Sequence, residues 1–106
     1  MTDLTPEEFE AEKYVSLFPQ LETAYKRAFD VLNERYDSSA VHAIDQQVLN
    51  ESEPFYEGDG EFRIELPPDP TDRIEGVVVP DEKVTELLDV YVEELERQLR
   101  AVFDVD

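Results

Sequence analysis

The sequence predicts an α+β fold that is mostly helical, with N-terminal helices and a long C-terminal helix packed on a small antiparallel β-hairpin. Helices are indicated because apolar residues recur at steps of three and four over 14–36 and again over 84–103. The hairpin is indicated because apolar and polar residues alternate over 61–66. With 106 residues, the chain has the length of a single domain, 1–106.

The N-terminal segment carries the clearest helix start in the chain. Thr5 can cap a helix, a proline occupies the first turn, and Glu8 stands where a capping box requires an acid. The residue before a proline is disfavoured in the helical conformation. Pro19 therefore predicts two helices, about 6–18 and 20–36, with one kinked helix as the alternative.

A third, shorter helix is predicted after Asp37, whose side chain can cap it. Four apolar residues between 39 and 50 then fall on one side of a helix, although a strand is compatible with the same residues.

Two strand patterns follow. Phe62, Ile64 and Leu66 share one face, and three prolines end the strand after them. Residues 76–79, with the sequence Gly-Val-Val-Val, predict a second strand that Pro80 ends. We expect these two strands to pair antiparallel.

The longest predicted helix covers about 82–103, with Asp81 as its cap. Its apolar stripe is wider than the seam of a coiled coil, so packing against the rest of the domain is favoured over a two-stranded coil. Leu95, in the middle of the stripe, is predicted to point into the core.

Charge is the most unusual property of the composition. The chain has 28 acidic and 9 basic residues, a formal net charge of -19, and no cysteine. High net charge is typical of disordered chains, but 41% hydrophobic residues in regular patterns favour a packed core. Salt screens the repulsion between carboxylates, so the composition predicts a halophilic protein; an acidic protein of a low-salt organism is the alternative.

The sequence predicts a cytoplasmic location. No stretch approaches the roughly 20 apolar residues that cross a bilayer, so no membrane association is expected. Residues 1–4 lack the basic start and apolar core of an export signal.

Several chemistries are disfavoured by the residues available. One histidine and no cysteine cannot form a structural zinc site, and the acidic residues between 51 and 61 lack the spacing of a calcium loop. Three glycines form no phosphate-binding loop. We therefore expect no cofactor and no metal. We also expect no direct nucleic-acid binding, because the basic residues are not clustered.

The candidate functional residues are few. Phe55 and Tyr56 could anchor a protein partner or a homo-oligomer, since interfaces use aromatic residues within a polar rim. His42 and Asp45, three residues apart, are weak candidates for an acid-base residue and its orienter in a small enzyme. We favour a non-enzymatic interaction module; the enzyme and an acidic mimic of nucleic acid are the alternatives.

The stretch 42–62 is the densest run of unusual residues, and together with the segment 92–96 it resembles a small family of uncharacterised acidic haloarchaeal proteins, a domain of unknown function. The resemblance covers most of the chain. It implies a salt-adapted protein and assigns no catalytic residue.

Folding is predicted to require high salt, because a charge of -19 on one small domain produces strong repulsion at low ionic strength. Circular dichroism at about 0.05 M and about 2 M potassium chloride should show more helix and a higher thermal midpoint in the concentrated salt, where the Debye length is below about 3 Å. Unchanged spectra and midpoints would contradict the salt argument.

Overall fold

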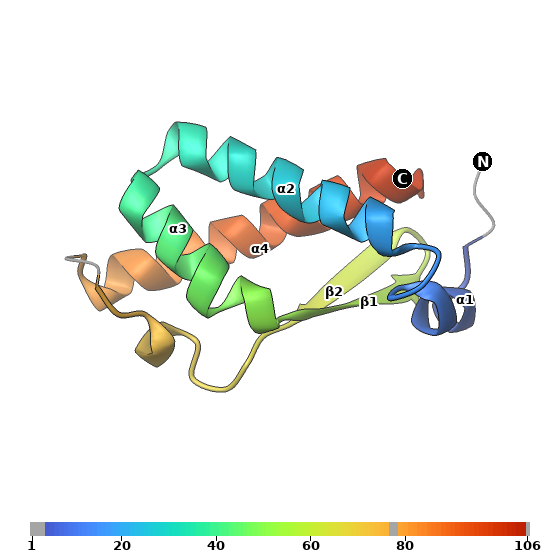
Figure 1. The fold of residues 1–106 in the computed structure, drawn as a ribbon, viewed down its shortest axis with the longest axis horizontal. Coiled ribbons are helices and arrows are strands. Elements are labelled where there is room, and N and C mark those ends of the chain that lie inside the picture. The colour runs from blue at the N-terminus through green and yellow to red at the C-terminus, as the bar shows by residue number, and fades with distance from the viewer. Residues whose placement is uncertain (1–3, 77–78, 106) are drawn as a thin grey trace.

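A computed structural model describes residues 4–76 and 79–105, and it confirms the mostly helical α+β fold (Figure 1). In chain order the elements are α1 (Pro6–Glu12), α2 (Phe18–Arg35), α3 (Ser38–Gln47), the short 3-10 helix η1 (Leu49–Glu51), β1 (Glu53–Gly58), β2 (Glu61–Glu65), a second 3-10 helix η2 (Thr71–Arg73), and α4 (Asp81–Phe103). The long C-terminal helix is therefore present as predicted.

Two antiparallel helices, α2 and α4, form the long axis of the molecule (Figure 1). The molecule measures 44 × 26 × 21 Å. The end of α2 leads into α3, which turns back toward the hairpin, and α1 packs on β1 at the opposite end. Within the described ranges, no helix has the length and apolar character needed to span a membrane.

The N-terminal helix is divided ahead of Pro19, as predicted. The backbone N–H of Glu8 donates to Thr5 Oγ1 at 3.1 Å, which confirms the cap. However, α1 ends at Glu12 rather than near residue 18. The N–H groups of Val15 and Leu17 both donate to the Glu12 carbonyl, at 2.9 and 3.0 Å, and this closed turn connects α1 to α2.

The other two helix starts differ in how well the sequence predicted them. The Asp37 side chain accepts a hydrogen bond from the Ala40 N–H at 2.9 Å, and the segment that follows is a helix rather than a strand. The predicted Asp81 cap is wrong, because Pro80 is the capping residue and makes no side-chain bond. Asp81 and Glu82 instead lie in the first turn, where their negative charges interact favourably with the positive end of the helix dipole.

The predicted strand over 61–66 is present as β2, but in the hairpin it pairs with a strand that precedes it in the sequence. β2 pairs antiparallel with β1, so that Ile64 lies opposite Pro54 and Phe62 opposite Tyr56. Of the predicted partner 76–79, Val77 and Val78 lie outside the described residues, and Gly76 and Val79 are in bends rather than in a strand. A proline and a nearby turn hide the alternation of β1 in the sequence, since both features normally interrupt strands.

The hairpin turn depends on glycine. Gly58, Asp59 and Gly60 all have positive φ angles, of 90°, 54° and 77°. A Cβ atom on Gly60 would lie 2.3 Å from the carbonyl oxygen of Val105, so only glycine allows the turn to approach the C-terminal segment.

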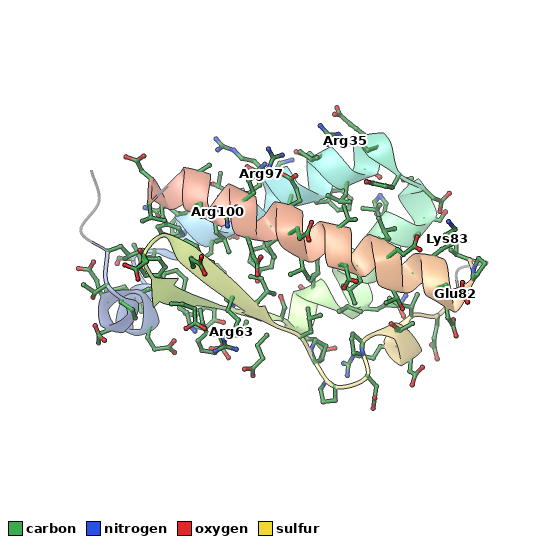
Figure 2. The ribbon with its side chains drawn as sticks, turned by 180° about the vertical axis from the view of Figure 1, so that it is seen from behind. Arg35, Arg63, Glu82, Lys83, Arg97 and Arg100 are labelled. Atoms are coloured by element: carbon green, nitrogen blue, oxygen red, sulfur yellow. The ribbon has the colours of Figure 1, made fainter. Side chains whose placement is uncertain are left out.

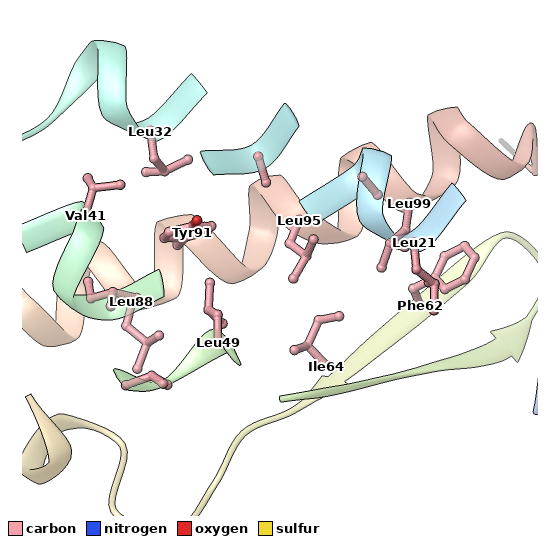
Figure 3. Close-up of a cluster of buried hydrophobic side chains, with 14 of the residues drawn as sticks. Leu21, Leu32, Val41, Leu49, Phe62, Ile64, Leu88, Tyr91, Leu95 and Leu99 are labelled. Atoms are coloured by element: carbon pink, nitrogen blue, oxygen red, sulfur yellow. The ribbon is translucent and has the colours of Figure 1, made fainter. Parts of the chain in front are cut away.

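The core fills the space between α2, α3, α4 and the hairpin (Figure 3). Leu32, Val41, Tyr91 and Leu95 come from three helices and are each at most 1% exposed. Phe62 continues the core into the hairpin, where it belongs to a cluster of rings. The ring centroids of Phe9, Tyr56, Phe62 and Phe103 lie 4.9 to 6.4 Å apart in the contacting pairs.

Leu95→Ala is expected to lower the free energy of unfolding by about 2–5 kcal/mol, because the side chain is fully buried and its removal leaves a cavity. Urea unfolding in high salt measures the change. Glu93→Ala, at an exposed position of the same helix, is the control and should change stability little. A loss for Leu95→Ala below about 0.5 kcal/mol would contradict the inward orientation.

Candidate functional site

A groove of about 340 Å³ lies where the α1–α2 turn, the end of α3 and the start of β1 meet. It is lined by Tyr14, Phe18, Leu21, Glu22, Tyr25, Asp45, Leu49, Asn50, Ser52 and Pro54. We call it the Tyr14 groove. Its volume is at the lower end of the range for ligand pockets, so it suits a side chain or a short segment.

One wall of the Tyr14 groove is apolar and open to solvent. Tyr14 is 55% and Phe18 42% exposed, and their ring centroids lie 6.3 Å apart with the ring planes tilted by 56°. Val15, beside them, is 70% exposed. The three- and four-residue spacing over 14–36 aligns Tyr14 and Phe18 with the apolar stripe that continues along α2. The turn ahead of Pro19 interrupts the helix and leaves both rings at the surface.

A chain of hydrogen bonds orders the polar side of the groove. Ser52 Oγ donates to the Leu49 carbonyl at 2.7 Å. Because its single proton is used there, Ser52 accepts the hydrogen bond that joins it to the Tyr25 hydroxyl at 3.0 Å. Burial raises the pKa of Tyr25 to about 12, although the bond to Ser52 opposes the shift. This phenol is therefore a neutral donor at physiological pH.

Asp45 brings a half-buried carboxylate to the groove. The Tyr91 hydroxyl donates to its Oδ1 at 3.4 Å, which is a long contact. Burial raises the pKa of Asp45, while Tyr91 and the nearby His42 oppose the shift. Burial and the Asp45 charge in turn raise the pKa of Tyr91. Asp45 thus has a neutral partner and no cation bonded to it among the described residues.

Glu22 adds a second carboxylate, from α2. It is exposed at the rim and forms no hydrogen bond or ion pair in the described part of the chain. Two carboxylates therefore line the groove beside an apolar wall, and neither forms an ion pair with a described residue.

Lys13, a cation next to the groove, is already paired with two carboxylates. Its side chain is 1% exposed, and Nζ lies 2.9 Å from Glu10 Oε1 and 2.8 Å from Glu53 Oε2. Nζ also donates to the Pro54 carbonyl at 3.1 Å. Burial alone disfavours the charged amine, but hydrogen bonds to Glu53 and Glu10 outweigh it, so the pKa of Lys13 is raised. Lys13 joins α1 to β1 behind the groove.

Phe55 and Tyr56 lie on opposite faces of β1 and do not form one patch. Phe55 is half-buried and contacts two cations, with Lys13 Nζ 4.0 Å and Arg63 Cζ 4.4 Å from the ring centroid. Tyr56 is 8% exposed, and its hydroxyl accepts the Gly60 N–H at 3.0 Å. The partner-binding role of both residues stays a prediction, and the contacts of Tyr56 assign it a role in the hairpin turn.

His42 and Asp45 point to different surroundings. His42 is exposed on α3, and its ring packs edge-on against Phe29 with centroids 4.9 Å apart. Asp45 lines the Tyr14 groove, whereas His42 does not. No hydrogen bond joins the two side chains in the ranges that the structure covers. Their acid-base role stays a prediction.

The remaining charged clusters are largely paired internally. In the acidic stretch between 51 and 61, Glu51 pairs with Arg73 and Glu57 with Arg63. Residues 4–76 and 79–105 contain no group of three or more side chains arranged to hold a metal ion.

A second hollow, of about 370 Å³, lies along the outer face of α4 and is lined by that helix alone. Figure 2 shows Arg97 and Arg100 on this helix and Arg35 on α2. Both oxygens of Glu94 accept from Arg97, at 2.7 and 2.9 Å, so the groups of this hollow bind one another.

Sequence analysis did not identify Tyr14, Phe18, Glu22, Tyr25 or Ser52 as site residues. The available signal was Pro19 itself: a helix broken there must turn the residues ahead of it out of the common stripe. The meeting of Tyr25 with Ser52 depends on packing between distant segments, which no local pattern contains.

Comparison with known families identifies the class of the protein. The model of a family of unknown function, DUF5783, matches residues 1–106, so the chain belongs to this family. No curated protein and no solved structure matched the chain.

Tyr25 is expected to make stability depend on pH in alkaline solution. Its pKa in the folded protein is about 12, whereas an unfolded tyrosine ionises near about 10. The stabilising contribution is therefore complete below about pH 10 and is lost as the pH rises toward 12. Tyr25→Phe should reduce the fall in unfolding free energy over this range by up to about 1.4 kcal/mol per pH unit.

Urea unfolding at several pH values measures this difference. Lys13 and Tyr91 titrate in both proteins, so the comparison isolates Tyr25. Tyr36→Phe, at a 45% exposed position, is the control and should keep the wild-type slope. Equal slopes for wild type and Tyr25→Phe would contradict the buried, bonded phenol.

Proposed function

We propose that this protein is a non-enzymatic protein-interaction module of a salt-adapted cytoplasm and that the Tyr14 groove is its docking surface. The observation that carries the proposal is the exposure of Tyr14 and Phe18 on the wall of a groove, in a chain with a net charge of -19. Interfaces use aromatic anchors surrounded by polar groups, and this groove has both.

Two features support docking rather than catalysis at the groove. Ser52 is bonded to Leu49 and Tyr25, so its hydroxyl has no base positioned to activate it. Asp45 has a raised pKa, as many catalytic acids do, but its hydrogen-bond partner is the neutral Tyr91. The groove therefore offers contact surface and fixed charges.

Salt adaptation is the finer part of the proposal. The acidic residues are mostly at the surface, while the core contains Lys13 and Glu94 as its buried charged residues in the described chain. Such a distribution suits concentrated salt, where screening removes the repulsion between surface carboxylates.

Removal of the groove aromatics is expected to weaken partner binding. The partner is first isolated from extracts of the producing cells by pull-down in high salt, and the affinity is then measured with both purified proteins. Tyr14→Ala and Phe18→Ala should each reduce affinity at least about fivefold, as anchor residues do. Phe55→Ala tests the surface predicted from the sequence.

Two variants serve as controls. Tyr36→Ala removes an exposed ring outside the groove, and His42→Ala removes the only histidine; both should leave affinity within a few-fold of wild type. Affinity that is insensitive to Tyr14 and Phe18 would contradict the docking surface. An activity lost only in His42→Ala would favour the enzyme.

A further inference from the structure

We propose that the Tyr14 groove binds a basic side chain, Lys or Arg, presented by a segment of a partner protein. This inference rests on the proposed docking function and specifies the chemistry of the partner. It follows from the combination of two carboxylates without counter-ions and two exposed aromatic rings in one concave site.

The charges around the groove favour a cation. Glu22 and Asp45 both line it, and no cation is bonded to either in the described residues. Lys13, behind the groove, is bonded to both Glu10 and Glu53, so that cluster contributes net negative charge. An acidic segment or a nucleic acid would bring like charge close to unscreened carboxylates, which is unfavourable.

The aromatic wall favours an organic cation over a metal ion. Tyr14 and Phe18 present ring surface that attracts ammonium and guanidinium groups and packs against the apolar stem that carries them. The protein already uses this contact, since Lys13 and Arg63 both lie against the Phe55 ring. A metal ion would instead need several converging oxygen ligands, and the described chain holds no such group.

The charge of the whole molecule favours a different protein over a second copy. Two chains that each carry -19 repel one another unless salt screens them. A basic partner is instead attracted by the same negative charges when it is in direct contact with them. Concentrated salt shortens the Debye length to about 3 Å, so only a cation placed directly against Glu22 or Asp45 retains the attraction.

Three matched peptides provide the probes. The first has the sequence Gly-Leu-Arg-Leu-Gly, and the others carry Gln or Glu in place of Arg. Each is titrated into the full-length protein at about 1 M potassium chloride, where general attraction is screened, and amide chemical shifts report both affinity and location. We expect the Arg peptide to shift groove residues and to bind about tenfold more tightly than the Gln peptide, with the Glu peptide weakest.

Charge-neutralising variants locate the effect. Glu22→Gln and Asp45→Asn should each weaken binding of the Arg peptide by about three- to tenfold. Glu34→Gln is the matched control. Glu34 is exposed on α2, the helix that carries Glu22, but lies outside the groove, so this change should leave binding unchanged. Circular dichroism verifies that each variant is folded.

Three outcomes would overturn the inference. Equal binding of the three peptides would mean that the groove does not select a cation. An equal effect of Glu34→Gln and Glu22→Gln would mean general attraction to an acidic surface. A dimer seen by sedimentation and lost in Phe18→Ala would make a second copy the occupant.

Failure of the inference and failure of the proposed function are distinguishable. If Phe18→Ala weakens binding of the isolated partner while Glu22→Gln and Asp45→Asn do not, the groove is a docking surface, and the inference that it binds a basic side chain is wrong. If the affinity for the partner is unchanged in all three variants, both proposals are wrong.

Discussion

The break in the N-terminal helix ahead of Pro19 is the constraint on which the rest of the arrangement depends. It allows α1 to fold onto β1 while α2 packs antiparallel to α4 (Figure 1). The turn that it creates buries Lys13 and exposes Tyr14, which are adjacent in sequence. A continuous helix would have aligned Tyr14 and Phe18 with the stripe that contains Leu21, and the Tyr14 groove would not form.

Three of the cations, Lys13, Arg63 and Arg73, lie where segments of the chain meet. Lys13 joins α1 to β1, and Arg73 joins the η2 segment to the end of α3 through the Gln47 carbonyl and Glu51. Arg63 connects Glu57 to Glu65 across the hairpin. Each of these three cations bonds more than one acceptor, so a single positive charge reduces the repulsion between acidic segments that meet. Exposed pairs such as Arg63–Glu57 contribute little stability individually, whereas the buried Lys13 depends on its partners.

Local chemistry made most of the fold predictable. Thr5 and Asp37 can act as caps through their own side chains, and the spacing of the C-terminal stripe identified Leu95 as buried. The first strand was missed because Pro54 and the glycines of the turn conceal its alternation; its identity depends on pairing with β2. The site was less predictable than the fold. Asp45 was identified for a different role, and the remaining groove residues come together only through tertiary packing.

A strongly acidic surface is compatible with a selective docking site only if the attraction by surface charge and the docking contacts act over different distances. At about 0.1 M salt, the field of a net charge of -19 extends about 10 Å from the surface and attracts cations to many places on it. Concentrated salt confines that attraction to direct contact. Under those conditions, a carboxylate that lines a groove with an aromatic side chain, as Glu22 does with Phe18, differs from the other surface carboxylates. In the proposed complex it would contact the cation while the ring contacts the cation's apolar stem. For the proposed basic partner, salt is therefore expected to increase the selectivity of the groove while it reduces the strength of attraction elsewhere.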